Sequence, residues 1–359
     1  MHGPRLSRLP LAVLLLLPLP LLLSTGGCLR SGFDFLRDGD RDATVDTQLP
    51  RADVPTDAVP DDVRIPTDVD SGLTDVLLDS APPSGWVVVP PQTIAMPVTF
   101  TVGSPSDEPC RDASREAQHQ VSLTRRFLLM DSEITQQMFS AQMGYNPSMT
   151  CTQGECPVTY VNWHEVVAYC NALSAAQQLE TCYEPTGGSG NSTTYRPKTK
   201  YAGTGSGTIY DCPGYRLPTE VEFEYAYRAG STTAFYPSPG NDGTIDVCSS
   251  STNADTIAWY SPNAGGSTKP RRGKAPNAWG LYDMAGNAWE WCHDWYGGNV
   301  GTTVDPAGPA TGSTRMLRGG GFGTAHFGAG TLRAAARSVD RQPSYRFQYI
   351  GGRCARTMP

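Results

Sequence analysis

The sequence predicts a loop-rich α+β fold for a single domain that begins at Gly85 and ends at Pro359. Gly, Pro, Asn, Ser and Thr recur in almost every block of ten residues, which is typical of frequent turns. Stretches with helical periodicity are few and short, whereas several short runs are rich in residues that favour strands. We therefore expect little long regular structure in this domain.

Three helices can be placed, because each follows a residue that can cap its first turn. Asn162 with Glu165 and Thr219 with Glu222 form capping-box patterns, in which each side chain bonds to the backbone of the other residue. Thr135 can cap the remaining helix. The helices are expected over residues 135–144, 162–173 and 219–230. Strands are expected over residues 86–89, 98–102, 120–123 and 127–130, where apolar and β-prone residues cluster.

The first 27 residues have the pattern of a secretory signal peptide. Arg5 and Arg8 precede an apolar run over residues 9–23, and small residues follow it. The run is short for a transmembrane helix and contains two prolines. Cys28 follows two glycines and resembles the lipid-modified cysteine of bacterial lipoproteins. We therefore expect export to the bacterial cell envelope and a lipid anchor at Cys28, on the periplasmic or the cell-surface side of a membrane.

Residues 28–84 are expected to form a disordered Asp/Pro-rich linker. They contain 13 Asp and 5 Arg, many prolines, and no Trp or Tyr. Burial of so few apolar groups cannot offset the loss of chain entropy on folding. The linker has a net charge of −8, and residues 1–27 have a net charge of +2. Since the whole chain has a net charge of −7, residues 85–359 have a net charge of only −1. A nearly neutral domain without clustered cations argues against a nucleic-acid partner.

Residues 318–338 read RGGGFGTAHFGAGTLRAAARS. This segment resembles the catalytic segment of the formylglycine-generating enzymes, also called sulfatase-modifying factors. Further parts of the chain match the same family in the same order. These are residues 116–139, 161–170, 216–228, 276–295 and 351–354. The resemblance implies a compact α+β domain similar to C-type lectins.

Family members that oxidise a sulfatase cysteine carry two reactive thiols in this segment, and here Thr324 and Ala329 occupy those positions. Copper(I) prefers soft thiolate ligands, so the resemblance implies that copper binding is lost. His326 lies between the two positions and is a weak candidate metal ligand, although a lone histidine in a glycine-rich loop is more often structural. Four glycines between residues 321 and 330 also predict a wider or more flexible groove.

The segment over residues 280–291, GLYDMAGNAWEW, is a candidate calcium site. Two carboxylates flank a tight turn there, and calcium accepts carboxylate and carbonyl oxygens in flexible geometry. Solvent-facing carboxylates are the alternative. The family resemblance implies a structural Ca²⁺ ion held by Asp283, Gly286, Ala288 and Glu290.

Nine cysteines follow Cys28, so at least one of them cannot be paired within the chain. The resemblance implies a disulfide between Cys170 and Cys354. It also implies the joint loss of a second family disulfide, at Tyr227 and Ala334. Local bridges between Cys151 and Cys156 and between Cys182 and Cys212 are plausible, while Cys110, Cys248 and Cys292 stay unassigned. Five arginines are expected to have structural roles, with partners among Glu220, Glu222 and Glu224. They are Arg216, Arg318, Arg333, Arg337 and Arg353.

Two functions are consistent with these features. The first is a binding or assembly module on the enzyme scaffold, without redox activity, that recognises an unidentified protein or peptide. The second is an oxidoreductase of this family that uses a different metal or thiol. A role in recruiting sulfatases to an active relative is a further possibility. The absence of both thiols favours the first function and argues against enzymatic activity.

Overall fold

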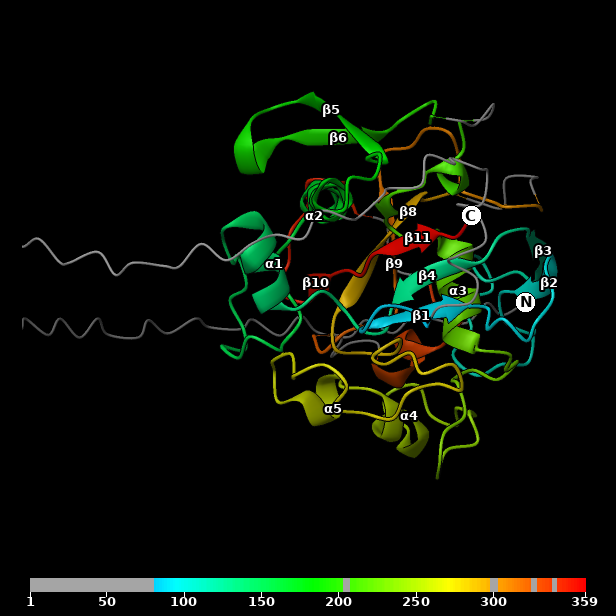
Figure 1. Cartoon of the computed structure of the whole chain (residues 1–359). Coiled ribbons are helices and arrows are strands. Elements are labelled where there is room, and N and C mark those ends of the chain that lie inside the picture. The colour runs from blue at the N-terminus through cyan, green and yellow to red at the C-terminus, as the bar shows by residue number, and fades with distance from the viewer. Residues whose placement is uncertain (1–80, 203–206, 298–302, 324–327, 338–340) are drawn as a thin grey trace, which may run out of the picture. The chain divides into compact units, whose positions relative to one another are not determined.

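Four small sheets and five short α-helices make up the part of the chain that the computed structural model describes, residues 81–202, 207–297, 303–323, 328–337 and 341–359 (Figure 1). The helices are α1 (Gln136–Met143), α2 (Trp163–Ala176), α3 (Glu220–Arg228), α4 (Thr252–Ile257) and α5 (Ser261–Ala264). Three short 3-10 helices are η1 (Gly190–Ser192), η2 (Ile209–Asp211) and η3 (Gly328–Leu332). Among the described residues, no helix is both long and apolar enough to cross a membrane.

The largest sheet has the strand order β1-β4-β11-β7, and a three-stranded sheet has the order β10-β8-β9. The hairpin-like pairs β2-β3 and β5-β6 form the two remaining sheets. The strands are β1 (Trp86–Val89), β2 (Val98–Val102), β3 (His119–Leu123), β4 (Phe127–Met130), β5 (Tyr183–Gly187), β6 (Thr194–Pro197), β7 (Tyr215–Arg216), β8 (Trp289–Trp295), β9 (Arg315–Arg318), β10 (Ile350–Gly351) and β11 (Ala355–Thr357). The predicted α+β fold with little long regular structure is confirmed.

The capping residues that the sequence singles out begin the helices they were expected to begin. Thr135 accepts a hydrogen bond from the Met138 amide at the start of α1. Complete capping boxes start α2 at Asn162 and α3 at Thr219. Helix α3 ends two residues earlier than predicted, because Ala229 already adopts the left-handed conformation that closes the helix.

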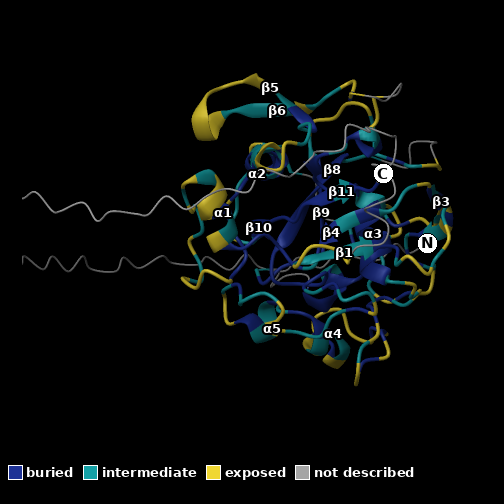
Figure 2. Ribbon diagram, in the orientation of Figure 1, coloured by how far each residue is buried: buried dark blue, intermediate teal, exposed yellow. Residues whose placement is uncertain are grey.

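The core lies around β8, β9 and β11, which are buried along most of their length (Figure 2). Strand β11 pairs with β4 on one side and with β7 on the other, so the end of the chain lies inside the largest sheet. The tip of the β5-β6 hairpin is exposed. Residues near the C-terminus therefore help to hold together strands from the beginning and the middle of the domain.

Arginine side chains join the loops to this core, as the sequence analysis expects. The guanidinium of Arg216 makes two hydrogen bonds of 2.7 Å to the Glu222 carboxylate, and both side chains are buried. Arg318 pairs with Glu224, and Arg337 pairs with Glu220. Planar guanidinium groups can hold a carboxylate through two parallel bonds and still donate to carbonyls. The predicted structural role of these arginines is consistent with these contacts.

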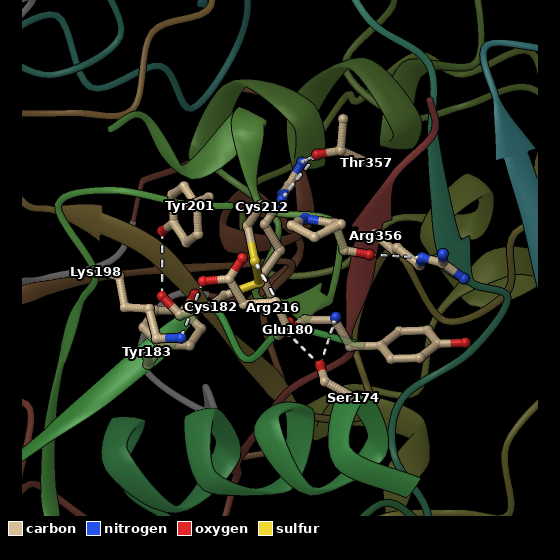
Figure 3. The surroundings of a disulfide bond; sticks show 12 residues. Ser174, Glu180, Cys182, Tyr183, Lys198, Tyr201, Cys212, Arg216, Arg356 and Thr357 are labelled. Atoms are coloured by element: carbon tan, nitrogen blue, oxygen red, sulfur yellow. Dashed lines mark hydrogen bonds and ion pairs between the residues drawn. A yellow bond between two sulfur atoms is a disulfide. The ribbon is translucent and has the colours of Figure 1, made fainter. Parts of the chain in front are cut away.

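Four disulfides connect the described residues, and Cys292 is a free, buried cysteine. Cys170 in α2 is bonded to Cys354 beside β11, as the resemblance implies. Both local bridges are present, and the two unassigned cysteines Cys110 and Cys248 form the fourth disulfide. Figure 3 shows the bridge between Cys182 and Cys212, where the Tyr201 hydroxyl donates to the Cys182 carbonyl at 3.2 Å.

The disulfides differ in the length of chain that they close, which predicts different contributions to stability. Cys170 and Cys354 are 184 residues apart, whereas Cys151 and Cys156 are 5 apart. In the chain-entropy description, replacing both cysteines of the long-range pair with alanine should lower the free energy of unfolding by about 5 kcal/mol, against about 2 kcal/mol for the short-range pair. Urea unfolding of the two double variants measures this difference. Equal losses would contradict the expectation.

Candidate functional site

A groove of about 410 Å³ is lined in part by residues 318–338, the segment that resembles the catalytic segment of the family. Its walls come from five parts of the chain that are distant in sequence. They include Cys110, Cys248, Trp289, Thr331, Arg337 and Tyr349. Volumes of this size are typical of sites that hold a small molecule or a few side chains of a partner. We refer to this cavity as the groove.

Arg333 fixes one wall of the groove. Its guanidinium donates to the carboxylates of Glu108 and Glu116 at 2.7 and 2.8 Å. It also donates to the carbonyl of Cys110 at 2.7 Å and to that of Gly330 at 2.9 Å. One buried side chain therefore joins the loop that carries Cys110 to helix η3.

Aromatic side chains form another wall. The Trp289 amide donates to the Tyr349 carbonyl at 2.8 Å, which holds the start of β8 beside the loop before β10. The Tyr349 ring packs on Phe347, with ring centroids 4.5 Å apart, and the Phe347 ring stacks on Tyr345. Tyr349 and Phe347 are half-buried. The groove therefore continues into a row of partly exposed rings.

The four glycines between residues 321 and 330 do not leave empty space, because a Cβ atom on any of them would meet a neighbouring residue. A Cβ atom on Gly323 would lie 2.2 Å from the Tyr349 ring, and one on Gly330 would lie 3.1 Å from the Cys110 Cβ. The expected widening of the groove is therefore absent there, because Tyr349 and Cys110 occupy the space that larger side chains would take. Ala329, at one of the family's thiol positions, is fully buried in η3. Thr324 and His326 lie outside the described residues.

A second cavity of about 320 Å³ adjoins the groove and shares Arg115, Glu116 and Arg337 with it. Asp294 lies in this cavity and accepts a hydrogen bond from the Glu220 amide at 2.7 Å, at the start of α3. Burial, together with the negative charge of Glu220, raises the pKa of Asp294 to about 8. Near neutral pH, Asp294 is therefore mostly a protonated acid.

The predicted calcium ligands lie around a buried group of carboxylates. Asp283 is buried, and its Oδ2 accepts a hydrogen bond from the Arg272 amide at 2.7 Å, while its Oδ1 has no hydrogen-bond partner. Glu290 is held by two bonds of 2.7 Å from Arg353. Gly286 takes a backbone conformation with φ of +81°, which makes the tight turn between them. Ala288 is fully buried.

Glu133 belongs to the same group and was not identified from the sequence. It is fully buried, and neither carboxylate oxygen accepts a hydrogen bond from another residue. Burial and the charges of Asp283 and Glu290 raise its pKa well above the ordinary value. In the sequence, Glu133 is followed by Ile134 shortly before the cap of α1. An acidic residue next to an apolar one is too common a pattern to indicate a site.

These orphaned oxygens fit a hard cation, because a buried carboxylate without a partner is costly. In the ranges that the structure describes, no three His, Cys, Asp or Glu side chains are already arranged as a metal-binding group. A calcium ion would therefore need backbone carbonyls as well, and Glu290 would have to share its carboxylate with Arg353. The residues fit such an ion in their chemistry, and Glu133 adds a carboxylate that the sequence analysis did not include.

The comparisons with known proteins agree with this architecture. Residues 81–358 match the sulfatase-modifying factor enzyme 1-like domain. The chain belongs to this family. A formylglycine-generating enzyme of Thermomonospora curvata is 35% identical in an alignment of 161 residues that covers 40% of the chain and 49% of that enzyme. The chain thus matches about half the length of that relative.

One further relative and one solved structure match a larger part of the chain. A chaperone protein LppX of Paenibacillus barcinonensis is 30% identical in an alignment of 217 residues that covers 55% of the chain and 69% of that protein. The structure of Treponema denticola variable protein 1 superposes with a TM-score of 0.59 at 31% identity, over 76% of the chain and 95% of that structure. The family fold is therefore present over the whole described domain.

The protonated state of Asp294 predicts how stability changes with pH. An exposed aspartate has a pKa of about 3.9, so the folded protein holds a proton that the unfolded chain releases between that pH and about 8. The stability that this proton provides is present below pH 4 and is lost as the pH rises through 8. Between pH 5 and pH 8 the loss from this group is up to about 4 kcal/mol.

Asp294→Asn keeps an oxygen acceptor for the Glu220 amide and removes the titration. Urea unfolding at pH 5 and pH 8 should therefore show a smaller loss of stability in the variant than in the wild type. The same loss in both proteins would mean that Asp294 does not hold the proton.

Proposed function

We propose that the protein is a binding or assembly module without redox activity, anchored in the bacterial cell envelope, and that the groove holds a peptide segment of a partner protein. The observation that carries this proposal is the groove itself, whose aromatic wall is intact although alanine occupies a position where the enzymes of the family have a thiol. Aromatic side chains in partly buried clefts supply much of the binding energy at protein interfaces. A relative described as a chaperone protein supports a binding role.

Random peptides displayed on phage can be selected against the immobilised protein to find ligands for the groove. Tyr349→Ala should weaken the selected peptides by roughly ten-fold or more, because it removes an aromatic contact from the wall. Tyr195→Ala is the matched control, since Tyr195 is also a half-buried tyrosine but lies on β6, outside the groove. Failure to select any peptide, or equal affinities in both variants, would contradict the proposal. Thermal melting of each variant confirms that it is folded.

A different function, an oxidoreductase that uses another metal or thiol, is favoured by one observation. The groove retains two sulfur atoms, those of Cys110 and Cys248, beside the segment that lost the family thiols. These sulfurs are joined in a disulfide and are not free ligands. Metal analysis of the purified protein tests the metal-dependent form of this function, because the binding module should contain no stoichiometric copper or iron.

We also propose that a structural Ca²⁺ ion is held by Asp283, Gly286, Ala288 and Glu290, with Glu133 as a further ligand. The support is the set of buried carboxylate oxygens without partners. Such an ion would neutralise like charges that oppose folding.

Calcium should therefore raise the melting temperature, and a concentration one hundred times the dissociation constant should stabilise the fold by about 2.7 kcal/mol. Glu133→Gln should be more stable than the wild type in EDTA, because a carboxyl whose ionised form the fold disfavours is replaced by a neutral amide. It should gain less from calcium, because the ion loses one carboxylate ligand. Glu155→Gln changes an exposed glutamate and serves as the control. A wild-type melting temperature that is the same in calcium and in EDTA would refute the calcium site.

The membrane anchor is proposed at Cys28, on the basis of the sequence around it. Labelling of a bacterial host with radioactive palmitate should mark the wild-type protein and place it in the membrane fraction. Cys28→Ser should remain unlabelled and leave that fraction. A labelled Cys28→Ser protein would show that the anchor is elsewhere, and an unlabelled wild type would show that there is none.

A further inference from the structure

One of the four disulfides, between Cys110 and Cys248, lines the groove. Cys248 is exposed and Cys110 is half-buried, and both line the groove. The remaining long-range bridges, between Cys170 and Cys354 and between Cys182 and Cys212, have both cysteines fully buried. Exchange of a disulfide requires that a thiolate reach one of its sulfur atoms. Among these three bridges, only the one in the groove meets that requirement without unfolding.

Both cysteines of this bridge are also held in place by contacts other than the disulfide. The Gly330 amide donates to the Cys248 carbonyl at 3.0 Å. The Arg333 guanidinium donates to the Cys110 carbonyl at 2.7 Å. Both contacts come from η3 and the residue after it, so the same short segment holds the two loops. If the bond between the sulfur atoms is broken, these contacts keep the two cysteines near each other.

We propose that Cys110 and Cys248 form a thiol–disulfide exchange site that accepts a peptide thiol from the groove. The thiolate of the incoming peptide attacks the Sγ atom of Cys248, the more exposed of the two. A new bond forms between these sulfurs, the bond between Cys248 and Cys110 breaks, and Cys110 leaves as a thiolate that takes a proton from water. The incoming thiol is oxidised and Cys110 is reduced, so the step needs no other oxidant.

This site differs from the two thiol positions of the family segment, which are Thr324 and Ala329 here. It also needs no metal. A reversible covalent bond would retain a cysteine-containing partner longer than the groove alone, because dissociation would then require the reverse exchange. This exchange is a redox step between thiols, so it replaces the strictly non-redox form of the binding module proposed above, while the groove and its peptide partner stay the same. It can hold even if no peptide binds tightly without a thiol.

Glutathione is a suitable probe, because it is a tripeptide with one thiol. The native protein is incubated with reduced glutathione at pH 8, quenched with acid, alkylated at its free thiols and mapped by mass spectrometry. The expected product carries glutathione on Cys248 and the alkylating group on Cys110, with the buried bridges intact. The proposal is overturned if no adduct forms in the native protein, if a buried bridge reacts as fast, or if Cys110 carries the glutathione.

A pair of variants tests whether the groove is the route to the disulfide. Thr331→Trp places a large ring in the groove and should slow adduct formation roughly ten-fold, the factor that a steric cost of about 1.4 kcal/mol produces. Thr311→Trp adds the same ring at an exposed position outside the groove and should react like the wild type. Equal rates in the two variants would show that the thiol does not pass through the groove. Peptide binding is measured with the disulfide intact, so its failure is separate from a failure of exchange.

Discussion

The buried ion pair between Arg353 and Glu290 is the interaction on which the rest of this structure depends. Both side chains are fully buried, and two hydrogen bonds of 2.7 Å join them. The same guanidinium donates to the carbonyls of Met130 and Tyr282, so it connects the end of β4, the loop before β8 and the C-terminal strands. Removing one partner of such a pair typically costs about 3–5 kcal/mol, because the other charge stays buried. The pair therefore fixes the position of β8, which supplies the aromatic wall of the groove.

Many loops in this fold are not hydrogen-bonded to a strand. Arginine guanidinium groups hold several of them in place through hydrogen bonds to carboxylates and carbonyls. Arg333 does this at the groove, where it satisfies two carboxylates and two carbonyls. At the place of a missing family disulfide, the Tyr227 hydroxyl donates to the Leu332 carbonyl at 2.6 Å. A hydrogen bond thus joins α3 to η3 close to the position where the family resemblance implies a covalent bridge in related enzymes. These contacts from Arg333 and Tyr227 hold η3 against α3 and against the loop that carries Cys110.

The parts of the fold that local chemistry determines could be predicted from the sequence. The caps at Thr135, Asn162 and Thr219 act within one helical turn, and the first four strands lie where β-prone residues cluster. Helices α4 and α5 were not predicted, because each is too short to show a periodic pattern. The bridge between Cys170 and Cys354 was expected from the family resemblance. Local chemistry alone cannot pair residues that are 184 positions apart.

The groove could be predicted only in part. The segment over residues 318–338 indicated its position, but Cys110 and Cys248 are 138 residues apart and reach it from separate loops. Glu133 was missed for the same reason, since its partners Asp283 and Glu290 are close to it only in the folded chain. Long-range contacts of this kind depend on the whole topology, and no local pattern encodes them.

The central claim is that this family scaffold binds without the redox chemistry of its relatives. Its most direct test is oxygen consumption and aldehyde formation on a cysteine-containing sulfatase peptide, with the wild-type protein and added copper(I). The account predicts no turnover above the level seen without protein, because the family resemblance places Thr324 and Ala329 at the positions of the copper-binding thiols. Formation of formylglycine by the wild-type protein would contradict it.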